Sequence, residues 1–409
     1  MFSVSVLGYG GRGNVYTHNF YSCGIKIAAV CDPDPERLEI AKQYSDNLYR
    51  DEDAFFGAGR LSDLLVISTM DKLHYRQAMR ALDLGYDILL EKPISTDAQE
   101  CIDIAQKAKE KNANVIVCHV LRYTPFFREI KAMLESGRFG KMLTLQMTEN
   151  VGYYHFAHSY VRGNWRNKET SSPVILAKSC HDLDIINWLV DSKCTSISSF
   201  GSLQLFRSEN APASSSERCR DCGCADECVF NCYKLYTNVE YERIAGLARH
   251  GHLGQTTDEI IYALDQDDEP LGRCVYHCDN DVFDNQIVNM SFANGVHAQF
   301  MLTAFSEHID RQIRICCEKG EIYGNLDGKA VHSIFYGQPE ETVHLQQVEE
   351  QYASHGGGDM GIVQAIIEHY VNGMPCASEV EQSVSSHLMC FAAENSAINN
   401  GITISCSIE

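Results

Sequence analysis

The sequence predicts an α/β protein in which a doubly wound parallel sheet precedes an α+β domain with a large, mostly antiparallel open sheet. Three observations predict this. A glycine-rich turn joins the first apolar run to a helix, and apolar runs then alternate with helical stretches through His119. Later apolar runs follow one another without obligatory helices between them. We place the domains at residues 1–122 and 123–409.

The first strand, Phe2 to Leu7, runs directly into the turn Gly8-Tyr9-Gly10-Gly11-Arg12-Gly13. Gly8 permits a sharp turn, Gly10 leaves room for a pyrophosphate, and Gly13 lets the next helix pack closely on the strand. The N-terminus of that helix offers N–H groups and a partial positive charge to phosphates. The order of these parts predicts a dinucleotide-binding Rossmann domain, although glycine triplets also occur in ordinary tight turns.

A second apolar run, Ile25 to Val30, ends in Cys31 and Asp32. A carboxylate about 20 residues beyond the last glycine can accept hydrogen bonds from both ribose hydroxyls. Because it would repel a 2′-phosphate, Asp32 favours NAD over NADP. Two alternatives remain: Asp32 is a solvated acid of the turn, or the nearby Arg37 accommodates the phosphate of NADP.

The rest of the first domain alternates helices with short apolar strands, which places ligands at the carboxyl ends of the strands. A helix that begins near Pro35 is expected to continue from Arg37 to Gln43. The following elements are a strand over Leu64 to Ile67, a helix over His74 to Leu84, a strand over Asp87 to Leu90, a helix over Asp97 to Lys111 capped by Ser95 or Thr96, and a strand over Asn114 to His119.

The pattern of apolar residues predicts a β-rich second domain from about Met142 onward. An open sheet with one uncovered face usually finds a partner, so we expect a homodimer or homotetramer. The composition of a polar, cysteine-bearing stretch at about 208–254 indicates an insertion or a lid on the second domain. The expected strands are Leu143 to Glu149, Thr195 to Phe206, Gln286 to Phe292, Val296 to Phe305 and Gln312 to Cys317, and the expected helices are His181 to Leu189, Met360 to Val371 and Glu379 to Asn399.

Charge and composition exclude several classes of partner. The chain has 34 Lys and Arg against 55 Asp and Glu, a net charge of -21, which argues against nucleic acid and against an anionic membrane. No apolar run is long enough to cross a bilayer, and the first strand starts too early to leave room for a leader. We therefore expect a cytoplasmic protein, with most of its 18 cysteines present as buried thiols.

One group of cysteines is an exception, because Cys219, Cys222, Cys224, Cys228 and Cys232 crowd into a short polar segment. The pairs Cys219-x-x-Cys222 and Cys228-x-x-x-Cys232 have the spacing of a tetrahedral thiolate site, most simply structural zinc. A segment with few apolar residues would gain order from such a metal. Reactive or incidental thiols are the alternative interpretation.

The motif Glu91-Lys92-Pro93 at the end of a strand, behind an N-terminal glycine turn, resembles the Gfo/Idh/MocA family of NAD(P)-dependent oxidoreductases. That family pairs a Rossmann domain with a C-terminal open-sheet domain, and the resemblance covers nearly the whole chain. It implies that Lys92 contacts both the nicotinamide ribose and the substrate hydroxyl. Pro93 would stiffen the loop that aims Lys92. An exposed loop lysine is the alternative.

Many family members carry an aspartate and, four residues later, a histidine on a helix of the second domain. Here His181 matches the histidine, whereas Ala177 stands at the aspartate position. We expect Lys178, one turn before His181 on the same helical face, to supply a base or a cation there. Asp184, one turn after His181, is expected to orient its ring. The alternative is that His181 is a satisfied core histidine under Trp188.

Two further stretches are candidates for the substrate wall, Cys118 to Pro125 and residues 153–166. In the second, aromatic faces would stack on sugar C–H surfaces while imidazoles and cations bind hydroxyls, although a subunit interface is an equal alternative. The predicted catalytic residues are Lys92, His181 and Lys178. The predicted cofactor-binding residues are Gly8, Tyr9, Gly10, Gly11, Arg12, Gly13, Asp32, Ser68, His74, Glu91, Lys92 and Arg122. The predicted substrate residues are Tyr154, His155, His158, Arg162, Trp165 and Asp182, and the predicted zinc ligands are Cys219, Cys222, Cys228 and Cys232.

The resemblance, together with these residues, implies an NAD-dependent dehydrogenase that acts on a secondary hydroxyl of a sugar, glycoside or cyclitol. Lys92 would take the hydroxyl proton while hydride moves to the nicotinamide, with His181 as partner or relay. One alternative is an NAD-dependent glycoside hydrolase, which oxidises a ring hydroxyl transiently, eliminates the aglycone and reverses the oxidation. Such an enzyme needs a further base, for which Tyr154, His155 and His158 are candidates. A cofactor-binding regulator without activity is the remaining alternative.

Overall fold

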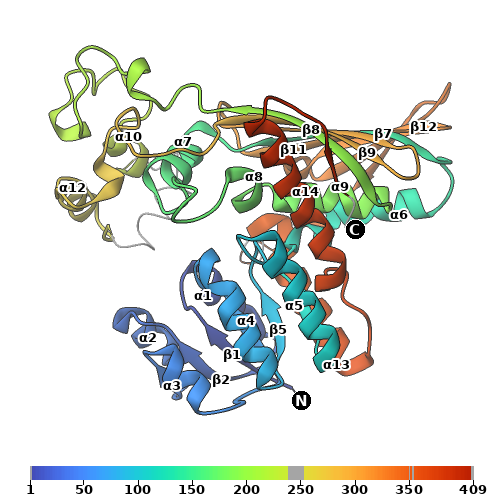
Figure 1. The fold of residues 1–409 in the computed structure, drawn as a ribbon, viewed down its shortest axis with the longest axis horizontal. Coiled ribbons are helices and arrows are strands. Elements are labelled where there is room, and N and C mark those ends of the chain that lie inside the picture. The colour runs from blue at the N-terminus through green and yellow to red at the C-terminus, as the bar shows by residue number, and fades with distance from the viewer. Residues whose placement is uncertain (1, 238–252, 350, 352–353, 407–409) are drawn as a thin grey trace.

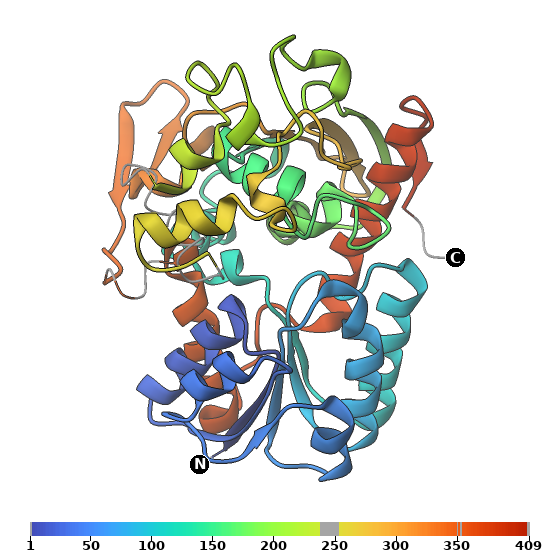
Figure 2. The same cartoon turned by 90° about the vertical axis from the view of Figure 1, so that its left-hand side faces the viewer.

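The computed structural model describes residues 2–237, 253–349, 351 and 354–406. Within them the chain forms two sheets, one of six strands and one of nine. Figures 1 and 2 show the two sheet-containing parts one above the other, with the N-terminal part below. The predicted insertion at 208–254 lies partly outside the described residues, which resume at residue 253.

The first sheet is parallel, in the order β3-β2-β1-β4-β5-β6. This is a doubly wound order, in which the strand sequence reverses between β1 and β4. Helices on both faces bury the strands, which explains why the strands read as continuous apolar runs. The strands are β1 (Ser3–Leu7), β2 (Lys26–Cys31), β3 (Leu48–Tyr49), β4 (Leu64–Ile67), β5 (Asp87–Leu90) and β6 (Val115–Val117). The helices are α1 (Gly11–Ser22), α2 (Pro35–Ala41), α3 (Glu52–Gly57), α4 (His74–Asp83) and α5 (Ala98–Lys111).

The cap of α5 is Asp97, which corrects the prediction of Ser95 or Thr96. The Asp97 side chain accepts hydrogen bonds from the backbone N–H groups of Gln99 and Glu100, which satisfies two otherwise unpaired donors of the first turn. The Ser95 hydroxyl donates instead to the Glu100 carboxylate. Ser95 thus lies too early in the chain to cap the first turn.

The second sheet is mixed, because β10 pairs with β7 in parallel while every other described pair is antiparallel. Burial alternates along β9, β10 and β11, so one face of the sheet is covered and the other is exposed. The order is β14-β13-β12-β11-β7-β10-β9-β8-β15. The strands are β7 (Met142–Asn150), β8 (Cys194–Ser202), β9 (Asn285–Phe292), β10 (His297–Thr303), β11 (Asp310–Cys317), β12 (Gly320–Asn325), β13 (Ala330–Phe335), β14 (Glu340–His344) and β15 (Ile404–Ser405).

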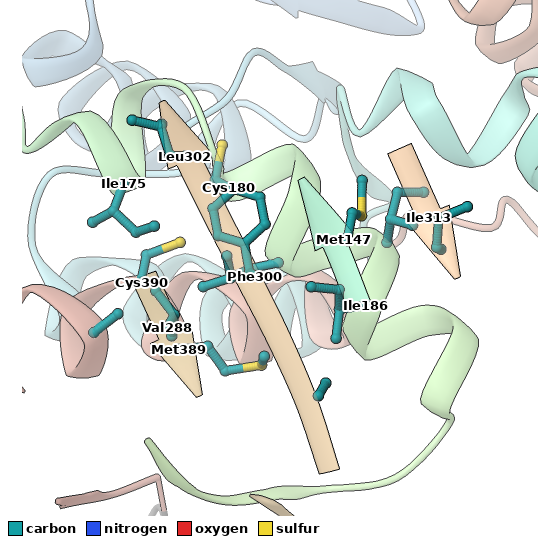
Figure 3. Packing of buried hydrophobic residues seen from close by; sticks show 14 of the residues in the cluster. Met147, Ile175, Cys180, Ile186, Val288, Phe300, Leu302, Ile313, Met389 and Cys390 are labelled. Carbon is teal, nitrogen blue, oxygen red and sulfur yellow. The ribbon is translucent and has the colours of Figure 1, made fainter. Parts of the chain in front are cut away.

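Helices cover the buried face of the second sheet, as Figure 1 shows. Phe300 and Val288 from the strands meet Ile186 of α9 and Met389 of α14 in one apolar cluster (Figure 3). The helices on this side are α6 (Pro125–Glu135), α8 (Val174–Ala177), α9 (Cys180–Val190) and α14 (Val380–Ile398).

The chain after the predicted boundary at residue 122 contributes to both parts. That boundary falls inside a short 3-10 helix, η2 (Val120–Tyr123), and α13 (Gly358–Asn372) then packs back onto the first part. Ile362 and Val363 of α13 share an apolar cluster with Val4 and Val6 of β1. This docking brings the polar start of α13 beside the glycine turn.

The aromatic run after β7, part of the predicted substrate wall, is helical. α7 (Tyr153–Phe156) continues directly into a π-helical segment, η3 (Ala157–Arg162). Two more short helices, α10 (Cys232–Thr237) and α12 (Thr257–Leu264), form a small apolar cluster of their own beside it.

In the described part of the chain, no helix combines the length and apolarity needed to span a membrane.

Candidate active site

The glycine turn requires glycine at two positions. Gly8 has a φ of +90°, and a Cβ there would lie 2.7 Å from the carbonyl oxygen of Ser68. A Cβ at Gly13 would lie 2.0 Å from the carbonyl oxygen of Gly8, which also accepts from the Ser68 hydroxyl at 2.7 Å. Around Gly10, by contrast, the nearest atom a Cβ would meet is Nη1 of Arg37 at 3.7 Å, and around Gly11 there is open space. The turn is therefore closely packed at Gly8 and Gly13 and open at Gly10 and Gly11, as a pyrophosphate site requires.

Asp32 is held at the end of β2, directly beside the turn. Its Oδ2 accepts from the backbone N–H of Tyr9 at 2.7 Å, and its Oδ1 accepts from the N–H of Asp34 at 2.9 Å. The Tyr9 ring itself is buried in the apolar core. Arg37 lies 3.7 Å from Asp32 and is half exposed. Two backbone N–H groups thus hold the Asp32 carboxylate in place beside the turn.

Arg12, predicted to bind the cofactor, connects three segments of the chain instead. Its Nε donates to Glu91 at 2.6 Å and its Nη2 donates to Asp359 of α13 at 2.7 Å. The second oxygen of Glu91 accepts from the backbone N–H of Lys92 at 2.9 Å. The Arg12 guanidinium, followed by Lys92, holds the pKa of Glu91 below its ordinary value although burial acts the other way. Two carboxylates neutralise Arg12, so its role is to fix the Glu91-Lys92 loop against the glycine turn.

The side chain of Lys92 reaches the second part of the molecule. Its Nζ donates to the backbone carbonyl of Ala177 at 2.6 Å, so a main-chain oxygen binds the ammonium at the position where the family places an aspartate. Behind the loop, the ring nitrogens of His74 face the carbonyl oxygens of Pro93 at 2.7 Å and Thr69 at 3.2 Å. His74, predicted to bind the cofactor, therefore supports the loop that carries Lys92.

His181 lies in α9 within the field of Lys92 and is almost fully buried. Burial, followed by the charge of Lys92, holds the pKa of His181 well below its ordinary value, so its ring is neutral. Its Nδ1 is buried with no hydrogen-bond partner in the described residues. The ring stands 5.9 Å from that of His119 and 6.2 Å from that of His355, measured between centroids. A satisfied core histidine would have its nitrogens paired.

Asp184 does not orient His181, because Arg122 occupies it. Nε and Nη2 of Arg122 each donate to the Asp184 carboxylate at 2.7 Å, and both side chains are buried. Nε2 of His119 lies 3.5 Å from the same carboxylate. The Arg122 guanidinium also lies over the Trp188 ring. Arg122 thus ties η2 to α9 and is not placed as the predicted cofactor ligand.

Lys178 is not on the helix of His181, which corrects the prediction of a shared helical face. The helix is interrupted, since α8 ends at Ala177 and α9 begins at Cys180. Nζ of Lys178 lies 3.2 Å from the buried carboxylate of Glu149. Lys178 thus places a cation beside Glu149, and the Glu149 carboxylate compensates its charge.

Arg311 links Glu149 to the predicted substrate residue Asp182. Its Nε lies 2.9 Å from Oε2 of Glu149 and 2.8 Å from Oδ1 of Asp182. Burial raises the pKa of Asp182 above its ordinary value, while Arg311 acts in the opposite direction. Sequence reasoning missed Glu149 and Arg311. Both occupy inward-facing positions in strands whose other inward-facing residues are apolar, and they stand directly opposite each other in β7 and β11.

The predicted substrate wall contacts the insertion and the apolar core. His158 pairs through Nδ1 with the hydroxyl of Tyr236 at 2.9 Å, and Arg162 donates to the carbonyls of Arg273 and Phe230 at 2.7 Å each. The other members lie against aromatic neighbours: Tyr154 against Tyr153 at 5.4 Å, His155 against Tyr160 at 6.3 Å and Trp165 against Tyr160 at 6.5 Å between centroids.

Three of the predicted zinc ligands, Cys219, Cys222 and Cys228, line one small cavity, whereas Cys232 is not among its lining residues. Cys232 hydrogen-bonds with Cys219, and the sulfur of Cys222 lies 3.4 Å from that of Cys224. Over residues 2–237, 253–349, 351 and 354–406, no group of three or more His, Cys, Asp or Glu side chains is placed to hold a metal ion. The four-cysteine zinc site at Cys219, Cys222, Cys228 and Cys232 is therefore not supported.

Comparison with known families matches nearly the whole chain. Residues 2–119 match the Gfo/Idh/MocA model described as "Oxidoreductase family, NAD-binding Rossmann fold". Residues 131–404 match the model described as "Oxidoreductase family, C-terminal alpha/beta domain". The two matches correspond to the parts that contain the first and second sheets.

Individual relatives are distant. YteT of Bacillus subtilis (strain 168), an oxidoreductase by name, is 22% identical over 83% of this chain and 81% of its own length. An inositol 2-dehydrogenase/D-chiro-inositol 3-dehydrogenase of Lactiplantibacillus plantarum is 25% identical, but the match spans only 51% of this chain and 58% of that protein. Among solved structures, levoglucosan dehydrogenase in complex with NADH and levoglucosan has the same fold, with a TM-score of 0.73, 15% identity and 99% coverage of both chains.

Proposed function

This chain belongs to the Gfo/Idh/MocA family of oxidoreductases, and we propose that it is an NAD-dependent dehydrogenase that oxidises a secondary hydroxyl of a sugar, glycoside or cyclitol. One observation carries the proposal: Lys92 from the first part reaches Ala177 of the second part, four residues before the neutral, incompletely paired His181. Inositol and levoglucosan dehydrogenases among its relatives support this substrate class.

Two nitrogen atoms have separate roles in the proposed reaction, the ammonium nitrogen of Lys92 and Nδ1 of His181. The Lys92 ammonium stabilises the negative charge that develops on the substrate oxygen. The neutral ring of His181 accepts the hydroxyl proton through its buried Nδ1. Bound NAD supplies the hydride acceptor. The proton thus goes to His181, whereas the sequence alone assigns it to Lys92.

The choice of NAD over NADP belongs to the same proposal. The fixed carboxylate of Asp32 would accept from the ribose hydroxyls and repel a 2′-phosphate. All 18 cysteines are free in the structure, which suits the reducing cytoplasm. The exposed face of the second sheet supports a homodimer or homotetramer.

The test is a panel of sugars, glycosides and cyclitols incubated with the protein and NAD. NADH absorbance and glycosidic cleavage are followed in the same reactions. Steady accumulation of NADH with at least one compound is the expected result. Release of aglycone without net NADH would replace the proposal with an NAD-dependent glycoside hydrolase. Tight NAD binding without turnover of any compound would indicate a non-catalytic regulator.

A further inference from the structure

The segment that leads into α13 follows an unusual backbone path. His355, Gly356 and Gly357 have φ values of +48°, +61° and +87°, so three consecutive residues lie in the left-handed region. Glycine adopts this region readily, whereas histidine does so at a cost in free energy. The path is closely packed, since a Cβ at Gly358 would lie 2.2 Å from the carbonyl oxygen of Val120. Backbone strain of this kind is concentrated at functional sites.

This path places the His355 ring beside both Asp359 and His181. Its Nδ1 lies 3.0 Å from Oδ2 of Asp359 and 3.5 Å from Nη1 of Arg12. Its ring centre lies 6.2 Å from that of His181. Charged or titratable groups thus face His355 from α1, α9 and α13. The side chain of His355 is 31% exposed, whereas His181 is almost fully buried.

Asp359 determines which nitrogen of His355 carries the proton. Burial acts to raise the pKa of Asp359, but Arg12 and then His355 hold it well below its ordinary value. The carboxylate is therefore ionised and can only accept a hydrogen bond, so Nδ1 of His355 is the donor. In the neutral ring the lone pair is then on Nε2, and the negative charge beside Nδ1 makes the ring a better base.

The proposed reaction leaves a proton on His181, where burial disfavours it. Burial, followed by the charge of Lys92, holds the pKa of His181 well below its ordinary value. His119, whose ring lies 5.9 Å from that of His181, is fully buried and offers no route to solvent. The partly exposed ring of His355 does. Its separation of 6.2 Å is too long for a direct hydrogen bond between ring nitrogens and suits one bridging water.

We propose that His355 receives the substrate proton from His181 through one water molecule and releases it to solvent, with Asp359 as its positioning residue. This inference rests on the proposed dehydrogenase function. The substrate O–H bond breaks, and its proton bonds to Nδ1 of His181. That nitrogen then gives the proton to the bridging water, as the water gives one of its own protons to Nε2 of His355. Release of this proton to solvent restores both neutral rings, so one proton leaves for each hydroxyl oxidised.

The first measurement needs neither substrate nor cofactor. The full chain is labelled with ¹⁵N-histidine, and the variant His355→Asn identifies the His355 resonances by their loss. Asparagine suits this position because it tolerates the left-handed region and can still donate to Asp359. We expect Nδ1 of the neutral His355 ring to carry the proton and Nε2 to carry none. A proton on Nε2 of the neutral ring would overturn the proposal, whether or not the chain oxidises a sugar.

The second measurement uses a compound that the unmodified chain oxidises. His355→Gly suits the left-handed backbone and leaves room for a small base. We expect kcat to fall about ten- to a hundred-fold in this variant. Added imidazole should restore it in proportion to its concentration, which a purely structural role would not produce. KM and the dissociation constant for NAD should change less than about two-fold, because Glu91 and Asp359 still hold Arg12.

His369→Asn, in the last turn of α13, is the control and should keep the native kcat without a response to imidazole. His355→Asn should show the same loss of kcat as His355→Gly, because asparagine offers no base. A native kcat in both His355 variants, or a loss that imidazole does not restore in His355→Gly, would overturn the relay and leave the dehydrogenase in place. Absence of turnover by the unmodified chain with every compound would overturn both.

Discussion

At the scale of single residues, Lys92 is the group whose removal should separate catalysis from binding. Its ammonium is held by the Ala177 carbonyl, and the proposal assigns the NAD phosphates to the glycine turn and the NAD ribose to Asp32. Lys92→Ala should lower kcat by roughly 10²–10³ because electrostatic stabilisation of the developing alkoxide is lost. The dissociation constant for NAD, measured by calorimetry, should change much less. Lys107→Ala, which removes an ion pair with the exposed Asp83 on the first part of the molecule, is the control.

Near-normal turnover in Lys92→Ala would remove this residue from the mechanism. Equal losses in kcat and in NAD affinity would instead indicate that the loop had moved, because Glu91 ties it to Arg12.

Asp32 should set the choice of cofactor. Asp32→Ser removes a charged acceptor and should weaken NAD binding about ten-fold or more, while NADP gains relative to NAD. The control is Asp34→Ser, because Asp34 caps α2 and a serine can keep that cap. The two dissociation constants decide the outcome for each protein. Tighter binding of NADP than of NAD by the unmodified chain would reject the assignment and give Arg37 the larger role.

Site residues that belong to local motifs could be predicted from the sequence. Residues that meet only through strand pairing or helix packing could not. The glycine turn, Asp32 and Lys92 each follow a buried strand, and their placement needs only neighbours in the chain. Glu149 meets Arg311 through the register of β7 and β11, and Arg122 meets Asp184 through packing of η2 on α9. An isolated charge at an inward position of a strand was the available signal for the first pair.

At the scale of elements, the glycine turn offers a matched pair of substitutions. Gly13→Ala places a Cβ 2.0 Å from the Gly8 carbonyl, so α1 must move away from β1. We expect a loss of about 2–3 kcal/mol in the free energy of unfolding without ligand, measured by urea denaturation. Gly11→Ala, where a Cβ meets nothing within 4 Å, should leave stability unchanged or slightly higher. Equal effects of both substitutions would show that α1 does not need the close approach.

Elements buried on both faces were predicted well because continuous apolar runs mark them, as at β4 and β5. Four strands of the second sheet, β12 to β15, were missed. One of the two edge strands, β14, is largely exposed and carries little apolar pattern. The break between α8 and α9 was missed too, because Val174 to Val190 is almost continuously buried and the pattern shows no interruption at Lys178.

At the scale of the whole molecule, buried histidines should make stability fall in mild acid. Burial lowers the pKa values of His119, His181 and His387, the last to about 3. In the unfolded chain each takes up a proton near pH 6.5, which the folded chain does not accept there. Their contribution is therefore present above pH 6.5 and is lost below it, by about 3 kcal/mol for the three between pH 6.5 and 5.5.

Urea denaturation at several pH values measures this slope. His387→Gln should reduce it by about one third, because one proton of the three is removed. A flat profile between pH 6.5 and 5.5 would show that these rings take up protons in the folded state.

The open face of the second sheet should hold the assembly together. Phe200, Ile287 and Met301 pair across β8, β9 and β10, and all three are exposed in the single chain. Covering such a row by a second copy would remove apolar surface from water, at roughly 25 cal/mol for each Å². The double variant Ile287→Lys, Met301→Lys should therefore sediment as a monomer, whereas we expect the unmodified chain to sediment as a dimer or tetramer. Val371→Lys, an exposed apolar position on α13, is the control and should keep the native mass.

A monomeric unmodified chain at micromolar concentration would exclude this contact between copies. A double variant of unchanged mass would place the contact elsewhere.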